Sequence, residues 1–161
     1  MVEAHNPTEV EDLLQKEPHG ELTAILTPTK MDIINFADAM ATALTSCKSK
    51  LALIDGQTYL VLNEAEFKLR VQDKTEDIPV RSQKPKKYDH TNYDTKTWKV
   101  HKHALVMYEE TRQYDQQIIS LIKTKFPQGL EGLYDDCGNL ILGTTAFQAI
   151  KQVSENIVDK S

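Results

Sequence analysis

The stretch between Asp94 and Pro127 constrains the fold most, because its pattern predicts one long helix from Asp94 or Thr95 to Phe126. Apolar side chains recur there at three- and four-residue spacing along two neighbouring stripes. One stripe holds Trp98, Leu105, Tyr108, Ile119, Ile122 and Phe126, and the other holds Ala104, Met107, Tyr114, Ile118 and Leu121. The middle, Glu109 to Gln117, is mostly polar. We therefore expect a helix that is buried at both ends, exposed at its centre and ended by Pro127.

Two shorter helices are predicted from their first residues. The Thr29 hydroxyl can cap a helix, and Asp32 three residues later favours the positive end of its dipole. Thr145 with Gln148 fits a capping box. Apolar residues then follow at helical spacing, up to about Ser46 in the first segment and Val158 in the second. Both segments are expected to bury one face.

Residues 51–62 predict a small β-hairpin. Two short apolar runs flank Asp55-Gly56, and Asp-Gly suits a turn that needs positive backbone torsions. Asn63 can then cap a short helix that runs to about Arg70. No residue in this unit is an obvious nucleophile, base or metal ligand, so Asp55 and Gly56 are predicted at most to form a contact at the hairpin tip.

The predicted fold class is mainly α, a helical bundle of about four to five helices with one small β-hairpin at 51–62. Residues 1–21 are polar and acidic, and we expect a flexible N-terminal segment there. Residues 22–161 are expected to form a single helical domain with a long loop at about 72–95.

Charge is unevenly distributed along the chain, although the net charge is only −5. This overall balance argues against the whole chain being a nucleic-acid binder. The first 21 residues are strongly acidic, whereas residues 81–102 are strongly basic. The two segments are either ordinary solvated surfaces or complementary surfaces, within one chain or between neighbouring subunits. Candidate polyanion or RNA contacts are Lys84, Lys86 and Lys87, beside Tyr88 and Tyr93.

Only two cysteines, Cys47 and Cys137, are present, and they are expected to be free thiols. The acidic N-terminus does not resemble a signal peptide, and no window approaches the ~20 apolar residues of a membrane span. These features predict a reduced, cytoplasmic protein without a membrane partner.

No catalytic, cofactor or metal site is predicted. His101 and His103 stand two apart, so a helix points them in different directions. Two acidic neighbours, Asp135 and Asp136, oppose the thiolate that a nucleophilic Cys137 needs. Residues 138–145 faintly resemble a phosphate-binding loop, but they lack its lysine and its glycine spacing. A binding or structural protein is favoured over an enzyme.

The order of short motifs resembles the Gag-like capsid region of copia-type retrotransposons from algae and other protists. The matching residues in the first half are Pro28-Thr29, Gly56 to Leu62 and Ala65-Glu66-Phe67. Downstream, a proline-containing spacer, a long helix, a short Leu/Tyr segment and a Thr-led helix follow in the family's order, at Pro79 to Pro85, Tyr108 to Phe126, Leu130 to Tyr134 and Thr144 to Val158. The resemblance covers roughly Leu22 to Val158. It implies an N-terminal capsid lobe, with the second lobe, zinc knuckle, protease and polymerase outside this sequence.

The leading functional hypothesis is therefore a self-assembling structural protein that forms a virus-like shell with copies of itself. One alternative is a small intracellular or phage-encoded adaptor that binds one partner without assembling. Another is RNA binding through residues 81–102. Each alternative is non-enzymatic and requires no cofactor.

Overall fold

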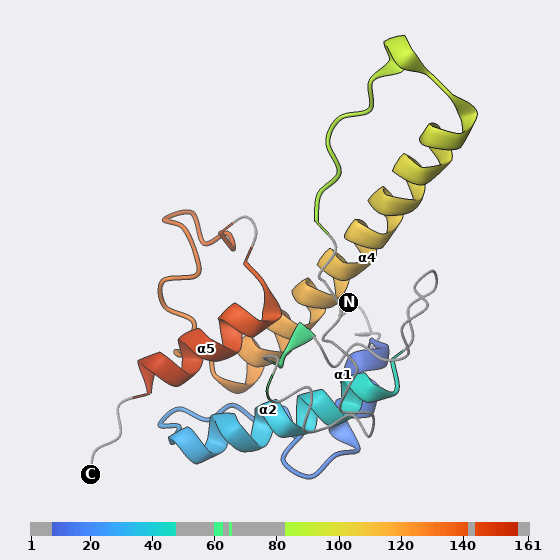
Figure 1. Cartoon of the computed structure of the whole chain (residues 1–161). Helices are drawn as coiled ribbons and strands as arrows, with labels where there is room; N and C mark the ends of the chain where they lie inside the picture. Colours follow the sequence, from blue (N-terminus) through green and yellow to red (C-terminus); the bar gives the residue numbers. More distant parts are fainter. Residues whose placement is uncertain (1–7, 48–59, 63–64, 66–82, 142–143, 158–161) are drawn as a thin grey trace, which may run out of the picture.

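Four α-helices and one 3₁₀ turn form the regular structure of the residues that this computed structural model describes, which are 8–47, 60–62, 65, 83–141 and 144–157 (Figure 1). The elements are α1 (Glu9–Gln15), α2 (Lys30–Thr45), η2 (His90–Asn92), α4 (Thr95–Lys125) and α5 (Ala146–Asn156). The prediction of a mainly α-helical fold is confirmed.

Local capping explains where three of these helices begin. The Thr29 hydroxyl accepts a hydrogen bond from the Asp32 amide at 3.3 Å, and the Asp32 carboxylate accepts one from the Thr29 amide at 2.8 Å. Thr145 and Gln148 exchange the same pair of bonds at the start of α5. Asp94 caps α4 by accepting from the Thr97 amide. All three predicted starts are confirmed.

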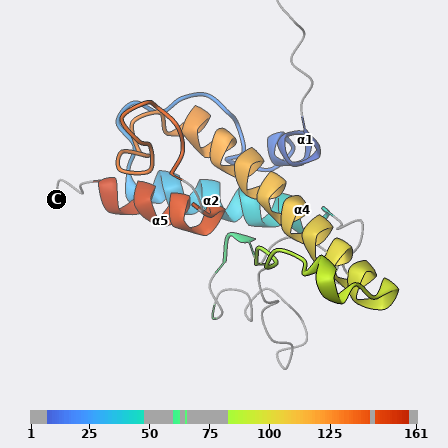
Figure 2. The same cartoon turned by 90° about the horizontal axis from the view of Figure 1, so that it is seen from above.

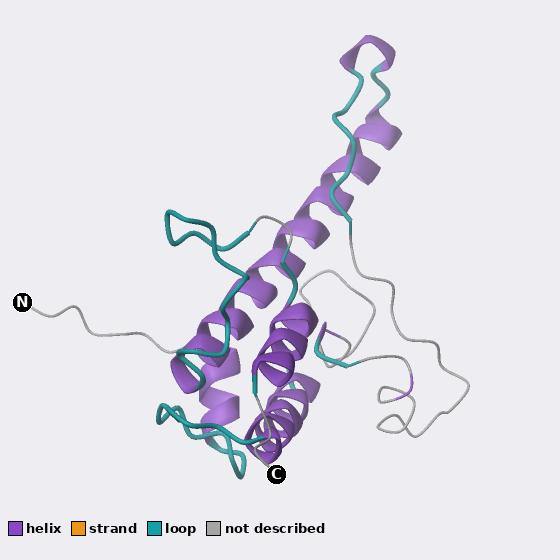
Figure 3. Cartoon of the chain, turned by 90° about the vertical axis from the view of Figure 1, so that its left-hand side faces the viewer, coloured by secondary structure: helices purple, strands orange, loops and turns teal. Residues whose placement is uncertain are grey.

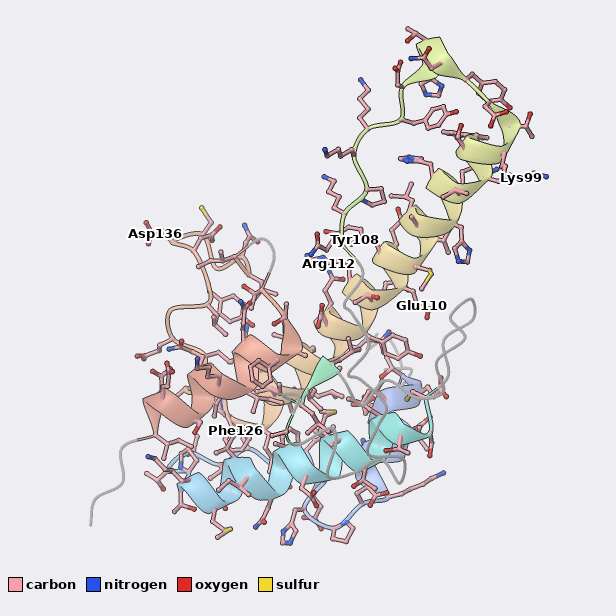
Figure 4. All side chains as sticks on the ribbon, viewed as in Figure 1. Lys99, Tyr108, Glu110, Arg112, Phe126 and Asp136 are labelled. Carbon is pink, nitrogen blue, oxygen red and sulfur yellow. The ribbon has the colours of Figure 1, made fainter. Side chains whose placement is uncertain are left out.

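The core lies where α2, α5 and the second half of α4 meet, with α1 against α2 and α4 (Figures 1 and 2). Phe36 of α2 and Phe126 at the end of α4 meet edge to face, with ring centroids 5.6 Å apart. In Figure 4, Phe126 lies between α5 and α2. The largest fully buried side chains also include Leu14, Ile33, Met40, Leu44, Leu60, Ile118 and Ile122.

Two buried polar side chains connect α4 to distant parts of the chain. The Asp115 carboxylate, 2 % exposed, accepts a hydrogen bond of 2.9 Å from the Ala146 amide in the first turn of α5. This amide lies at the positive end of the α5 dipole, where a carboxylate is stabilising. The Lys125 ammonium donates to the Glu21 carbonyl and lies over the Phe36 ring. These bonds fix the second half of α4 among its neighbours.

Part of the acidic segment 1–21, for which flexibility was predicted, is helical, and residues 1–7 lie outside the described part of the chain. Residues 9–15 form α1, capped by Thr8, and Val10 and Leu14 are fully buried. The two apolar side chains stand four apart, so they share one face of the short helix. Their burial against α2 and α4 orders a segment whose charge suggested none.

The predicted hairpin is not supported. Residues 48–59, with Asp55 and Gly56, lie outside the described residues, as does most of the helix predicted from Asn63 to Arg70. Leu60 and Val61 form a turn and not the second strand, and Leu60, Val61 and Leu62 are all buried. Three successive buried side chains do not fit a strand with one solvent face, since its side chains alternate between faces.

The exposure of α4 also differs from the prediction. Its first buried residue is Thr111, and everything from Thr95 to Glu110 is exposed or half-buried. Figure 3 shows this first half of α4 extending beyond the other helices. The helix is therefore buried at its C-terminal end only. Trp98, Leu105 and Tyr108 do share one face of α4, but they are only half-buried because the core formed by the other helices does not extend that far.

The arm is the extended segment 83–89, η2 and the first half of α4, Thr95–Glu110. The body is α1, α2, α5 and the second half of α4, Thr111–Lys125, with the segments that join them.

Candidate functional site

The arm is a two-layered projection in which the extended segment 83–89 runs back along α4 (Figures 1 and 3). The sixteen helical residues it contains extend for about 24 Å at 1.5 Å per residue. Part of the long loop predicted at about 72–95 thus forms one layer of the arm. Residues 72–82 lie outside the described part of the chain.

Tyr88 holds the two layers together. Its ring meets Trp98 edge to face with centroids 4.8 Å apart and lies 5.4 Å from His101. Its hydroxyl accepts a hydrogen bond from the Asp94 amide at 3.1 Å and lies 2.9 Å from the Thr97 hydroxyl. An aromatic pair with hydrogen bonds at its polar end is a specific attachment, so the extended segment is held in one position on α4.

The lysines of the arm are exposed, whereas Asp89 and Asp94, the two acidic residues near its tip, make local bonds; Glu109 and Glu110 lie at its base. Asp94 caps α4 and Asp89 accepts hydrogen bonds from Thr91 and Asn92. The Thr91 hydroxyl and amide, with the Asn92 side chain, lower the pKa of Asp89 below its ordinary value. The exposed basic side chains are Lys84, Lys86, Lys87, Lys96, Lys99 and Lys102, of which Lys102 lies 5.8 Å from the Trp98 ring centroid. The arm therefore presents a basic surface to solvent.

The predicted RNA-contact residues lie on this surface, but they do not share one environment. Lys84, Lys86 and Lys87 are exposed along the extended segment. Tyr88 is half-buried in the ring cluster, so its faces are largely occupied. Tyr93 is 58 % exposed and is the tyrosine available for stacking at the tip.

A second candidate site is an apolar groove of about 540 Å³ on the body, between α2 and α5. Two of its residues are large and partly open to solvent: Ile34 is 58 % exposed and Phe147 36 % exposed. Its other apolar residues are Ile33, Ala37, Val61, Leu62 and Ile150, and its polar ones are Asp38, Lys151, Ser154 and Glu155. A volume of this size accommodates several side chains of a partner.

The sequence pattern did not single out this groove. Phe147 is spaced from Ile150 and Val153 as a core residue would be, and Val153 is indeed fully buried. Ile34 stands directly after Ile33, on the edge of the buried face of α2. Spacing identifies the apolar side of a helix, but it does not show where a neighbouring helix leaves that side uncovered.

The candidate chemical residues remain separate. His101 stacks on Trp98, with ring planes 15° apart, whereas His103 is exposed. Among the described residues, no three His, Cys, Asp or Glu side chains gather as metal ligands would. Cys137 is exposed in a turn where the Asp135 carboxylate accepts from the Cys137 and Asn139 amides. Asp135 thus closes the predicted turn, and Asp136 is exposed beside it.

Cys47 is an inert core residue. It is fully buried at the end of α2, and burial, with a smaller contribution from Glu9, raises the pKa of its thiol to about 11. Both cysteines are free.

Comparison with protein families, with curated proteins and with solved structures gave no match for this chain. The resemblance to copia-type capsid regions therefore rests on the order of motifs in the sequence. Within the described part of the chain, no helix is both long and apolar enough to cross a membrane.

Proposed function

We propose that this chain is a structural subunit that assembles with copies of itself, as the capsid lobe of a cytoplasmic, virus-like particle. The supporting observation is that one chain carries two unlike surfaces on separate parts, a basic arm and an apolar groove that the described residues leave open. The resemblance to a Gag-like lobe implies the same function.

Unlike surfaces favour a shell over a simple pair. A contact between two different patches repeats from subunit to subunit and generates rings, shells or filaments. Each single contact can be weak, because many of them are made at once. The exposed acidic residues Glu9 and Asp12 of α1 add a further surface complementary to the basic arm.

The non-enzymatic part of the proposal rests on the described side chains. Cys137, the exposed candidate nucleophile, lies in a turn beside two carboxylates and not beside a base that could activate it. Of the two histidines of α4, His101 belongs to the aromatic cluster and His103 lies on the exposed surface of the helix.

Negative-stain microscopy and light scattering of the purified chain test the proposal across a range of salt and protein concentrations. We expect regular oligomers or shells that grow with concentration. Monomers under every condition would contradict self-assembly. A single dimer that does not grow would favour the alternative of a small adaptor.

RNA binding through residues 81–102 is the second candidate function, favoured by exposed lysines on a held, projecting arm. Its affinity should fall steeply with salt, because phosphate contacts release counterions. Replacing Lys84, Lys86 and Lys87 with Ala should weaken binding to single-stranded RNA and reduce the salt dependence. Unchanged binding after the triple substitution would remove this candidate.

A further inference from the structure

One stripe of the arm helix is apolar and lies away from the extended segment. Val100, Ala104 and Met107 follow one another at spacings of four and three residues, so they share one face of α4. Thr111, the next residue along this face, is buried in the body. The stripe therefore continues the core-facing side of α4 into a region where the body no longer covers it.

The extended segment covers a different face of the arm. Tyr88 contacts Trp98 and His101, and Trp98 lies two residues from Val100, which places the two on nearly opposite sides of the helix. Val100 is 64 % exposed, and Ala104 and Met107 are half-buried. Among the described residues of one copy, the extended segment leaves this apolar stripe accessible to a partner.

The groove of the same copy is out of reach of its arm. The groove is formed by the first half of α2, by Val61 and Leu62, and by α5. Figures 1 and 2 both show the arm extending away from α5 and from the first half of α2. An arm that occupies such a groove must come from another molecule.

The charges beside the two surfaces are complementary. Lys96 stands four residues before Val100 and Lys99 lies beside the stripe, with Glu110 further along the same edge of α4; in Figure 4 Lys99 points away from the extended segment into solvent. The groove has two carboxylates, Asp38 and Glu155, against one ammonium, Lys151. An apolar ridge with a net positive charge along one edge thus matches an apolar groove with a net acidic lining.

We propose that the stripe Val100–Ala104–Met107 of one copy lies in the α2–α5 groove of a second copy, an inference that rests on the proposed self-assembly. This is a helix-in-groove contact, in which a few apolar anchors enter the groove and charged neighbours set the orientation. The contact joins unlike surfaces, so every bound copy still offers a free arm or a free groove. Chains of copies grow until the geometry closes them.

Two substitutions separate the halves of this contact. Ile34→Asp disables the groove and leaves the arm, and Val100→Asp disables the arm and leaves the groove. Both side chains are exposed, so neither change removes core packing. After nuclease treatment, each variant alone should require an at least about tenfold higher concentration to assemble than the original chain. An equimolar mixture should form a 1:1 dimer that grows no further, seen by size-exclusion chromatography with light scattering.

Matched controls are Val106→Asp, on another face of the arm, and Leu26→Asp, outside the groove; these side chains are 46 % and 66 % exposed. Both should assemble normally. Circular dichroism checks folding. In a Cys137→Ser background, Val100→Cys on one copy and Ile34→Cys on another should form a disulfide between copies, which tests the contact without introducing charge.

The outcomes distinguish the two levels of the proposal. If the original chain assembles and both Asp variants assemble equally well, or if the mixture stays monomeric, the arm-in-groove contact is wrong and self-assembly stands. If the original chain is monomeric under every condition, self-assembly itself fails. Assembly that nuclease treatment abolishes would assign the arm to nucleic acid and overturn the contact.

Discussion

The arm and the body contain the same helix, α4, but they stabilise it in different ways. In the body, α4 buries Ile118, Ile119 and Ile122 in the core and contacts α5 and α1. In the arm, it is covered on one side by a seven-residue extended segment held through Tyr88. A continuous helix therefore passes from a packed core to a thin projection, and the two parts should respond differently to substitution.

Removing an aromatic ring from the body should have the largest effect. Phe36→Ala deletes a fully buried side chain and its edge-to-face contact with Phe126, which should lower the free energy of unfolding by about 3–5 kcal/mol. Urea unfolding followed by circular dichroism measures this loss. Val100→Ala, in the exposed part of the same fold, is the control and should change stability little. Equal losses for both variants would remove the distinction between body and arm.

A smaller loss is expected where the body uses a polar contact. Asp115→Ala leaves the buried Ala146 amide without this carboxylate and should cost about 1–3 kcal/mol. The same unfolding measurement applies. Asp94→Ala, which removes the exposed cap of α4 in the arm, provides a matched carboxylate, and its cost should be about 0.5–2 kcal/mol. A larger loss for Asp94→Ala than for Asp115→Ala would reverse the expected order.

The arm should loosen without unfolding the body when its attachment is removed. Tyr88→Ala removes the ring against Trp98 and the bonds to Asp94 and Thr97. Hydrogen exchange should rise in the arm and stay unchanged from Thr111 to Lys125. Trp98, the only tryptophan, should show red-shifted fluorescence as water reaches it. Tyr88→Phe retains the ring, so its effect should be intermediate, about 0.5–1.5 kcal/mol within the arm. Faster exchange throughout the body would contradict this separation.

The smallest effect, at neutral pH, concerns the two thiols. Cys137 should react quickly with a thiol reagent, whereas Cys47 should react only after the body opens. Above pH 9 the unfolded chain loses the Cys47 proton while the folded chain keeps it up to about pH 11. The stability that Cys47 contributes is therefore present below pH 9 and is lost as the pH rises toward 11. Counting reactive thiols with and without urea tests the difference, and two equally fast thiols in the folded chain would contradict it.

Local signals made the helix boundaries predictable. The caps at Thr29, Asp94 and Thr145 act through residues three positions away, so the sequence alone contains both partners. Pro127 likewise marks the end of α4, one residue after Phe126. These boundaries depend little on the rest of the fold.

The arrangement of surfaces was not predictable in the same way. Trp98 and Ile122 both belong to apolar stripes of α4, but one meets an extended segment and the other meets the core. Periodicity shows which side of a helix is apolar and not what covers it. For the same reason the groove at Phe147 and the ordering of α1 by Val10 and Leu14 required the tertiary structure.

The hydrogen bond that the Ala146 amide at the start of α5 donates to Asp115 couples α4 mechanically to α5. Asp115 lies just below the arm, and the amide that it holds belongs to Ala146, next to Phe147 of the groove. A small tilt of α4 about this hydrogen bond would move the tip of the arm much further than it moves the first turn of α5. Conversely, a neighbour that holds the tip restrains the tilt and steadies the groove on the same subunit. We therefore expect a contact at the arm tip to affect the groove of the same subunit.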